Sequence, residues 1–199
     1  MVTTEADPTP LVLSLARTLR ASAQVPALRD LMAQTSGSVA LKSVTDAQAA
    51  TLTFDGDGVL VSHGLAEDAA QADLIFDPEY TVGESTDPVA QAAAQLLGPP
   101  LPDWREAAAR FWEINRDMSG FPSRLVIVCW DEEARESFGE GEGDDVYEIH
   151  GYGPALAAVL SGQVDSFLIA AAYGVVTIVG SAAHMSVMCG AHWKVRFGG

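Results

Sequence analysis

The run from Ser166 to Trp193 contains no Asp, Glu, Lys or Arg, in a 199-residue chain that carries 27 acidic and 11 basic residues. A run of this length can form a transmembrane helix, an ordinary core or the wall of an apolar pocket. Gly174, Gly180 and Gly190 interrupt it, and the residues between the first two are mostly β-branched. We therefore expect a helix, then a strand, then a second helix or strand, and no integral membrane span.

The composition predicts a folded protein, because 48% of the residues are hydrophobic and only 19% are charged. The length suits one full core or two small domains that share an interface. We favour a single domain over residues 1–199, with a loose polar tail at 1–8. Residues 83–145 are expected as an insertion, and the acidic, glycine-rich stretch 131–146 at its end as a loop that is either mobile or a cap over a pocket.

The net charge of −16 argues against nucleic acid and anionic lipid headgroups as partners, because it repels phosphate groups. Cys129 and Cys189 are too few for a disulfide framework, and their apolar neighbours are typical of buried thiols. The N-terminal residues lack the pattern of a secretory signal. These features together predict a cytoplasmic protein.

Local periodicity predicts a mixed α+β chain. Helices are expected at 10–23, 26–32, 87–98, 103–118, 154–162 and 164–174, and strands at 38–44, 49–64, 72–77, 124–130, 147–149 and 175–180. Residues 183–190 fit either a helix or a strand, and 192–197 alternate like a closing strand. Residues 50–98 and 124–180 have a weakly similar layout, but no repeat is strong enough to indicate a duplication.

The residues between Leu160 and Gly180 follow a specific order. Leu160-Ser161-Gly162 is followed by Asp165, Phe167, Ala170 or Ala171, Gly174, Val176, Ile178 and Gly180. This order resembles the C-terminal half of the sterol carrier protein family, and the resemblance covers residues 147–197 best. It implies a mainly antiparallel sheet of about five strands covered by helices, with an apolar tunnel between them.

The tunnel implied by the resemblance would hold a fatty acyl chain, a sterol or a similar lipid, which the protein would carry or sequester. Its expected lining is uncharged, and the two methionines in it would adapt to ligands of varied shape. The expected ligand-binding residues are Trp112, Phe167, Leu168, Ala171, Tyr173, Val176, Ile178, Met185 and Met188.

The same side chains also fit a closed core, and the chain is then a non-enzymatic module for protein–protein interaction. In that alternative its acidic surface and the aromatic helix 103–118 meet a partner. Trp112 on this helix is expected either in the core or as a gate over the tunnel mouth or a homodimer contact.

No catalytic residue, metal ligand or cofactor is predicted. Asp55-Gly56-Asp57-Gly58 indicates a hairpin turn and not a calcium loop, because Leu60 stands where that loop needs glycine. His184, Cys189 and His192 follow no structural zinc spacing. The chain has no G-x-S-x-G string and no phosphate-binding loop. A weaker third hypothesis is an enzyme that uses His150 or His184 with a nearby carboxylate.

Overall fold

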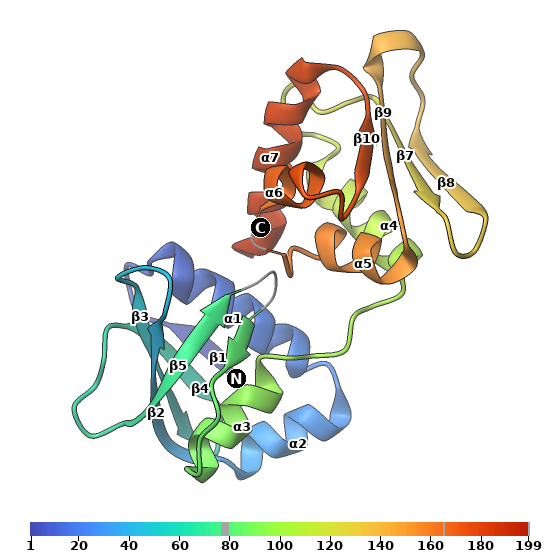
Figure 1. Cartoon of the computed structure of the whole chain (residues 1–199). Coiled ribbons are helices and arrows are strands. Elements are labelled where there is room, and N and C mark those ends of the chain that lie inside the picture. The colour runs from blue at the N-terminus through green and yellow to red at the C-terminus, as the bar shows by residue number, and fades with distance from the viewer. Residues whose placement is uncertain (77–79, 165, 199) are drawn as a thin grey trace. The chain divides into compact units, whose positions relative to one another are not determined.

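The computed structural model describes residues 1–76, 80–164 and 166–198. The chain divides into two compact units, unit 1 (Met1–Pro100) and unit 2 (Leu101–Phe197), each with its own hydrophobic core (Figure 1). Both units combine helices with a sheet, which confirms the mixed α+β class. The expected insertion at 83–145 crosses the boundary, because its first helix belongs to unit 1 and its later elements to unit 2. Whether the units act as one domain stays a prediction.

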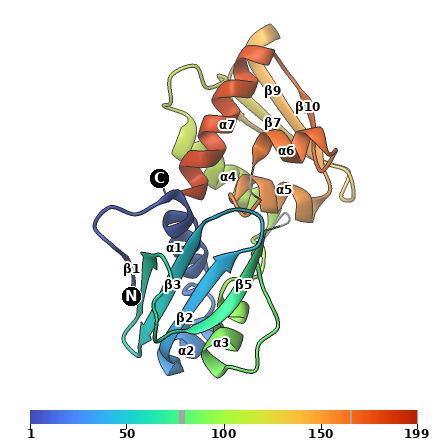
Figure 2. The ribbon, with the colours of Figure 1, turned by 60° about the vertical axis from the view of Figure 1, so that its left-hand side comes forward.

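Unit 1 is a six-stranded sheet with three helices. Its elements are β1 (Val2–Thr4), α1 (Pro10–Ser22), α2 (Pro26–Gln34), β2 (Ser36–Ser43), β3 (Ala49–Asp55), β4 (Val59–His63), β5 (Ala70–Phe76), β6 (Tyr80–Val82) and α3 (Pro88–Leu96). The strand order is β1-β4-β3-β2-β5-β6 (Figure 2). β2, β3 and β4 form an antiparallel meander, β5 runs parallel to β2, and β6 is antiparallel to β5.

Alternation along the strands of unit 1 places apolar side chains on the face that the helices cover. Val39, Leu52 and Val61 are paired across three neighbouring strands and are all fully buried. Helix α1 packs against this layer with Leu15 and Leu19, and the Ser22 hydroxyl on it donates a hydrogen bond of 2.5 Å to the Leu96 carbonyl of α3. The core of unit 1 therefore lies between the sheet and one helical layer.

The hairpin turn expected at 55–58 is confirmed. Asp55 Oδ1 accepts hydrogen bonds from the backbone N–H groups of Asp57 and Gly58, at 3.0 and 2.8 Å. The helix expected at 87–98 is α3, and the Asp87 carboxylate caps its first turn by accepting from Val89 and Ala90. Val2–Thr4, within the expected loose tail, instead form β1 and pair in parallel with β4.

Unit 2 is a four-stranded sheet with four α-helices among its described residues. Its elements are α4 (Trp104–Asn115), β7 (Arg124–Cys129), β8 (Ala134–Gly139), a 3-10 turn η1 (Gly143–Asp145), β9 (Val146–Gly151), α5 (Gly153–Leu160), α6 (Phe167–Ala172), β10 (Thr177–Val179) and α7 (Ala182–Arg196). The strand order is β10-β9-β7-β8. β8 and β10 are antiparallel to their neighbours, whereas β9 is parallel to β7.

The helices of unit 2 lie on one face of its sheet (Figure 1). Leu125 and Ile127 of β7 and Tyr147 and Ile149 of β9 point into this layer and are fully buried. The alternate residues, among them Glu148 and His150, lie on the opposite face of the sheet.

Three sequence expectations for the fold are wrong. A single sheet of about five strands is replaced by two mixed sheets, because the strand that follows the β2–β4 meander (β5) and the strand that follows the β7–β8 hairpin (β9) each pair in parallel with its first strand. Residues 192–197 belong largely to α7 and not to a strand, since the buried residues of this segment recur at helical spacing. Within the expected loop 131–146, residues Ala134–Gly139 form β8 along β7.

The uncharged run is divided among α6, β10 and α7, as its glycines indicate. Within the part of the chain that the structure describes, no helix is both long enough and apolar enough to cross a membrane.

Candidate functional site

The segment that was expected to hold a ligand is built from two capped helices and a short strand. The Ser166 hydroxyl accepts a hydrogen bond from the Ile169 N–H at the start of α6, and the Ser181 hydroxyl accepts from the His184 N–H at the start of α7. Gly174 follows α6 with a φ of +73°, a left-handed conformation that glycine adopts without strain. Serine caps and glycine therefore fix where these helices begin and end.

The structure separates the nine expected ligand-binding residues. Most of them belong to the core of unit 2 or pack against it, but two of them face solvent. Phe167, Val176 and Met188 are buried, and Trp112, Ile178 and Met185 pack against the same core, whereas Ala171 is half-buried and Leu168 and Tyr173 are exposed. The set therefore does not form one continuous lining.

Neighbouring side chains contact the inward-facing members of this set. The ring centroids of Phe167 and His192 are 6.3 Å apart.

 The Tyr147 hydroxyl donates a hydrogen bond of 3.5 Å to the Met185 sulfur. Trp112 stacks on Phe138 with centroids 6.3 Å apart. These contacts fill the layer between sheet and helices at the positions where a tunnel was expected.

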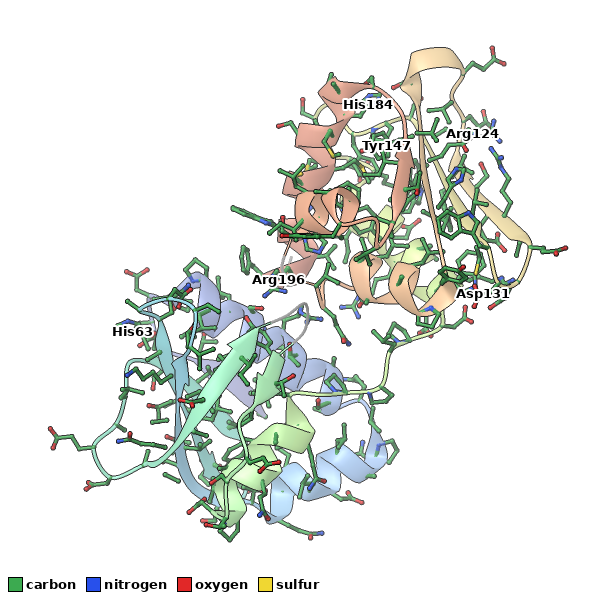
Figure 3. All side chains as sticks on the ribbon, in the orientation of Figure 1. His63, Arg124, Asp131, Tyr147, His184 and Arg196 are labelled. Carbon is green, nitrogen blue, oxygen red and sulfur yellow. The ribbon has the colours of Figure 1, made fainter. Side chains whose placement is uncertain are left out.

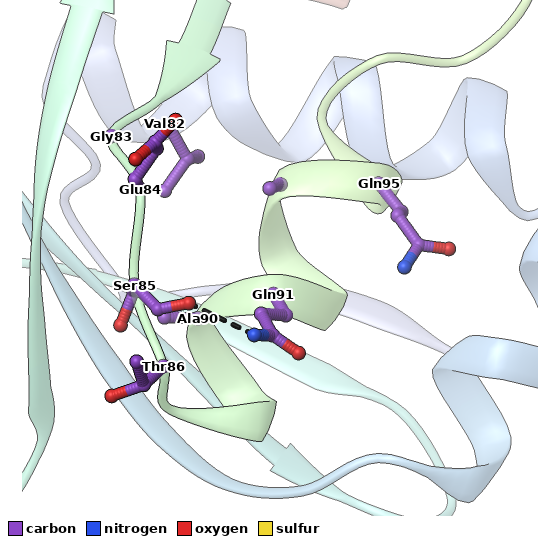
Figure 4. Close-up of a pocket in the computed structure, with 9 residues that line it drawn as sticks. Val82, Gly83, Glu84, Ser85, Thr86, Ala90, Gln91 and Gln95 are labelled. Atoms are coloured by element: carbon purple, nitrogen blue, oxygen red, sulfur yellow. Dashed lines mark hydrogen bonds between the residues drawn. The ribbon is translucent and has the colours of Figure 1, made fainter.

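A groove lies in unit 1, whereas the expected site belongs to unit 2. It has a volume of about 670 Å³ and runs between α3 and the residues that follow β6 (Figure 4). Its lining is Val82, Gly83, Glu84, Ser85, Thr86, Ala90, Gln91, Ala94 and Gln95, and none of the nine expected residues is among them. The Gln91 side chain donates a hydrogen bond of 2.9 Å to the Ser85 carbonyl across it. Most of the side chains that line the groove are therefore small or polar.

The outward side of α6 carries large apolar side chains. Leu168 and Ile169 are about half exposed, at 52% and 48%, and Tyr173 is 83% exposed. Cys189 of α7 lies against the backbone of Leu168, and burial raises the pKa of its thiol. Trp193 follows Cys189 by about one helical turn and is 55% exposed. We call Leu168, Ile169, Tyr173 and Trp193 the α6 surface.

Sequence reasoning identified Leu168 and Tyr173 but missed Ile169 and Trp193. The signal that could have found Ile169 is the sequence FLIAAA of α6, which is apolar on every side of the helix, so that not all of its side chains can face the core.

His150 lies on the open face of the unit 2 sheet in a line of charged side chains. Its Nε2 is 2.8 Å from Glu148 Oε2, and Arg135 donates a hydrogen bond of 2.7 Å to Glu148 Oε1. The hydrogen bond from His150, helped by Arg135, holds the pKa of Glu148 below its usual value. Among the described residues, no serine, threonine or cysteine side chain is hydrogen-bonded to His150. This arrangement is an ion-pair network without a nucleophile.

His184 forms a second polar cluster with Ser123 and Asp145, beside Tyr147 (Figure 3). Asp145 accepts a hydrogen bond from the Ser123 hydroxyl, which lowers the pKa of Asp145, and its other oxygen is 3.7 Å from His184 Nε2. A serine hydrolase needs the imidazole between serine and carboxylate, so that it can take the serine proton. Here the carboxylate stands between them, and the cluster does not have that geometry.

Within residues 1–76, 80–164 and 166–198, no group of three or more His, Cys, Asp or Glu side chains could hold a metal ion. No protein-family model, curated protein or solved structure matches the chain. The α6 surface is therefore the candidate site that the geometry of the chain itself supports.

Proposed function

We propose that the chain is a non-enzymatic binding protein that docks a partner protein through the α6 surface. The observation that carries this proposal is the exposure of Leu168, Ile169 and Tyr173 on one short helix. Single exposed apolar residues are common, but several together on one element mark interaction sites. Tyrosine and tryptophan are also the residues that most often dominate binding energy at protein interfaces.

The charge of the chain supports a protein as the partner. The α6 surface belongs to the run 166–193, which has no charged residue, whereas the whole chain has a net charge of −16. An anionic membrane surface would attract a basic flank and repel this acidic chain. A protein that presents an apolar patch with a neutral or basic rim would complement both the uncharged α6 surface and the negative charge of the whole chain.

The tunnel for a fatty acyl chain or sterol remains a second hypothesis, and with it the resemblance to the sterol carrier family. It requires Phe167, Val176 and Met188 to move apart, since these side chains are buried in the core of unit 2. A lipid bound there would therefore have to displace core contacts.

The proposal can be tested with the double variant Leu168→Gln/Tyr173→Gln. The matched control is Val44→Gln/Leu65→Gln, which changes two exposed apolar residues of unit 1. A protein captured by the wild-type chain is purified and its affinity for each variant is measured by calorimetry. We expect the α6 variant to bind at least about tenfold more weakly and the control to bind as the wild type does.

Two other outcomes would overturn the proposal. Native mass spectrometry that shows a bound lipid, with a thermal shift in oleate that survives in the α6 variant, would favour the tunnel. Sedimentation velocity that shows a dimer of the wild type, lost in the α6 variant, would make a second copy the partner.

A further inference from the structure

Trp130 and Tyr152 form an exposed aromatic pair at one end of the unit 2 sheet. They follow directly after the parallel neighbours β7 and β9, and the Trp130 N–H donates a hydrogen bond of 2.9 Å to the Gly151 carbonyl. Their rings meet edge to face with centroids 5.4 Å apart, although Trp130 is 41% and Tyr152 58% exposed. Two aromatic rings that contact each other in solvent leave further faces available to a partner.

The turn that follows Trp130 is acidic, and two of its three carboxylates are held within the chain. Asp131 Oδ1 accepts hydrogen bonds from the Cys129 thiol at 3.0 Å and from the Gly153 N–H at 2.8 Å. Glu132 accepts a hydrogen bond of 3.0 Å from the Trp104 indole. These bonds fix the turn against the start of α5 and against α4.

Glu133 is the carboxylate of this turn that remains available. It is exposed and makes no hydrogen bond or ion pair with any residue in the described part of the chain. Its φ is +49°, in the left-handed region that glutamate seldom adopts. A non-glycine residue held there often belongs to a functional turn.

The same end of unit 2 already binds one arginine of the chain itself. The Arg105 guanidinium lies 4.3 Å from the centre of the Trp104 ring, and it pairs with Glu132 at 2.7 Å and with Glu136 at 3.4 Å. This is a guanidinium held by an aromatic face and by carboxylates. Trp130, Tyr152 and Glu133 offer the same groups to a second cation.

We propose that Trp130, Tyr152 and Glu133 form a surface that binds an arginine side chain from a basic segment of a partner protein. Arginine fits better than lysine, because its planar guanidinium stacks on aromatic rings and pairs with a carboxylate through two parallel hydrogen bonds. The net charge of −16 attracts a basic segment over longer distances. This inference goes beyond the α6 surface and does not depend on it.

The test uses the full-length chain and a tetra-arginine peptide amide, titrated by calorimetry at low salt. The Trp130 indole signal is followed by NMR in the same titration. We expect each of the variants Trp130→Ala, Tyr152→Ala and Glu133→Gln to weaken binding of the peptide about two- to fivefold, because exposed cation–aromatic and ion-pair contacts contribute little individually. A tetra-citrulline peptide, which has the shape of arginine without its charge, is expected not to bind.

Matched controls separate this surface from general attraction to an acidic protein. Leu65→Ala removes an exposed apolar side chain of unit 1, and Glu113→Gln removes another exposed carboxylate. Both controls should bind the arginine peptide as the wild type does. The proposal is overturned if the controls weaken binding as much as the three variants, if citrulline binds equally well, or if the Trp130 signal does not move. Thermal unfolding of each variant verifies that it is folded, and none of these outcomes bears on the α6 surface.

Discussion

Units 1 and 2 share one strand arrangement, although their sequences show only a weak similarity of layout. In unit 1, β3 and β2 are antiparallel, β5 lies parallel to β2 on its other side, and β6 is antiparallel to β5. In unit 2, β8, β7, β9 and β10 repeat this order and these directions. A helix follows the last strand in both units, α3 in one and α7 in the other.

The two units differ in what they add to this shared sheet. Unit 1 adds the strands β4 and β1 beyond β3, whereas unit 2 adds α5 and α6 between β9 and β10. Residues 77–79 alone separate the matching strands β5 and β6 of unit 1. Leu168 and Ile169 of the α6 surface lie on the added helix α6, and Tyr152 of the second proposed surface directly precedes the added helix α5. The comparison suggests that the sheet is the scaffold and the added helices carry the binding.

The largest expected effect comes from emptying a central core position in each sheet. Leu41 of β2 and Ile127 of β7 are both fully buried inward-facing residues. Leu41→Ala and Ile127→Ala should each lower the free energy of unfolding by about 2–5 kcal/mol, from lost burial and the cavity left behind. Denaturant unfolding measures the loss, and hydrogen exchange locates it.

We expect each of these substitutions to weaken exchange protection mainly in its own unit, because each unit has a separate core. Equal loss of protection in both units would contradict this and would show that residues 1–199 unfold as a single domain.

The next effect concerns the hydrogen bonds that join the segment after α5 to the end of α7. Arg196 at the end of α7 is buried, and its Nη1 donates hydrogen bonds to the carbonyls of Gly162, Gln163 and Val164, which follow α5. Arg196→Ala leaves these carbonyls without their donor and should cost about 3 kcal/mol of stability. Arg116→Ala, at an exposed ion pair, is the control and should cost less than about 1 kcal/mol. Equal losses in thermal or denaturant unfolding would show that Arg196 does not anchor this segment.

The elements of the fold follow from local patterns, but their pairing does not. Proline, serine and aspartate caps and the glycine stops indicate most helices and the hairpin turn. The parallel pairing of β2 with β5, and of β7 with β9, joins segments that are separated by other strands. Nothing in the local spacing specifies such a partner, and the expectation of a single sheet of about five strands was wrong for this reason.

A third test compares two glycines of the uncharged run that are alike in sequence but not in surroundings. A methyl group at Gly180 would collide with the Tyr147 ring, whereas one at Gly190, within α7, would meet open space. Gly180→Ala should therefore destabilise the protein by about 1–3 kcal/mol. Gly190→Ala should stabilise it by up to about 1 kcal/mol, because alanine favours the helix. Thermal unfolding decides, and a loss of stability at Gly190 would contradict the helical packing described for α7.

The residues of the candidate site could be predicted only in part from the sequence. Residue types identified an uncharged run that could be either core or pocket wall, and only the packed structure shows which side of α6 is covered. Phe167 and Leu168 are adjacent and similar in type, yet one is buried and the other is half exposed. The exposed Trp130–Tyr152 pair joins the residues that directly follow β7 and β9, two strands that pair only in the folded sheet.

The smallest expected effect separates the open faces of the two sheets by their response to pH. The open face of unit 2 carries Glu148 with its partners His150 and Arg135, whereas Ser38 and Thr53 on the open face of unit 1 share a neutral hydrogen bond. The pKa of Glu148 is lower in the folded protein than its ordinary value of 4.5. Its contribution to stability is therefore present above pH 4.5 and is lost as the pH falls through the folded pKa, because the unfolded chain then binds more protons.

Glu148→Gln should accordingly reduce stability at pH 7 by less than about 1 kcal/mol, since the network is partly exposed. It should also make the loss of stability below pH 4.5 less steep than in the wild type, whereas Ser38→Ala should leave that slope unchanged. Denaturant midpoints measured from pH 7 down to pH 3 provide the comparison. An unchanged slope in Glu148→Gln would mean that the hydrogen bonds of Glu148 with His150 and Arg135 do not contribute to folding stability.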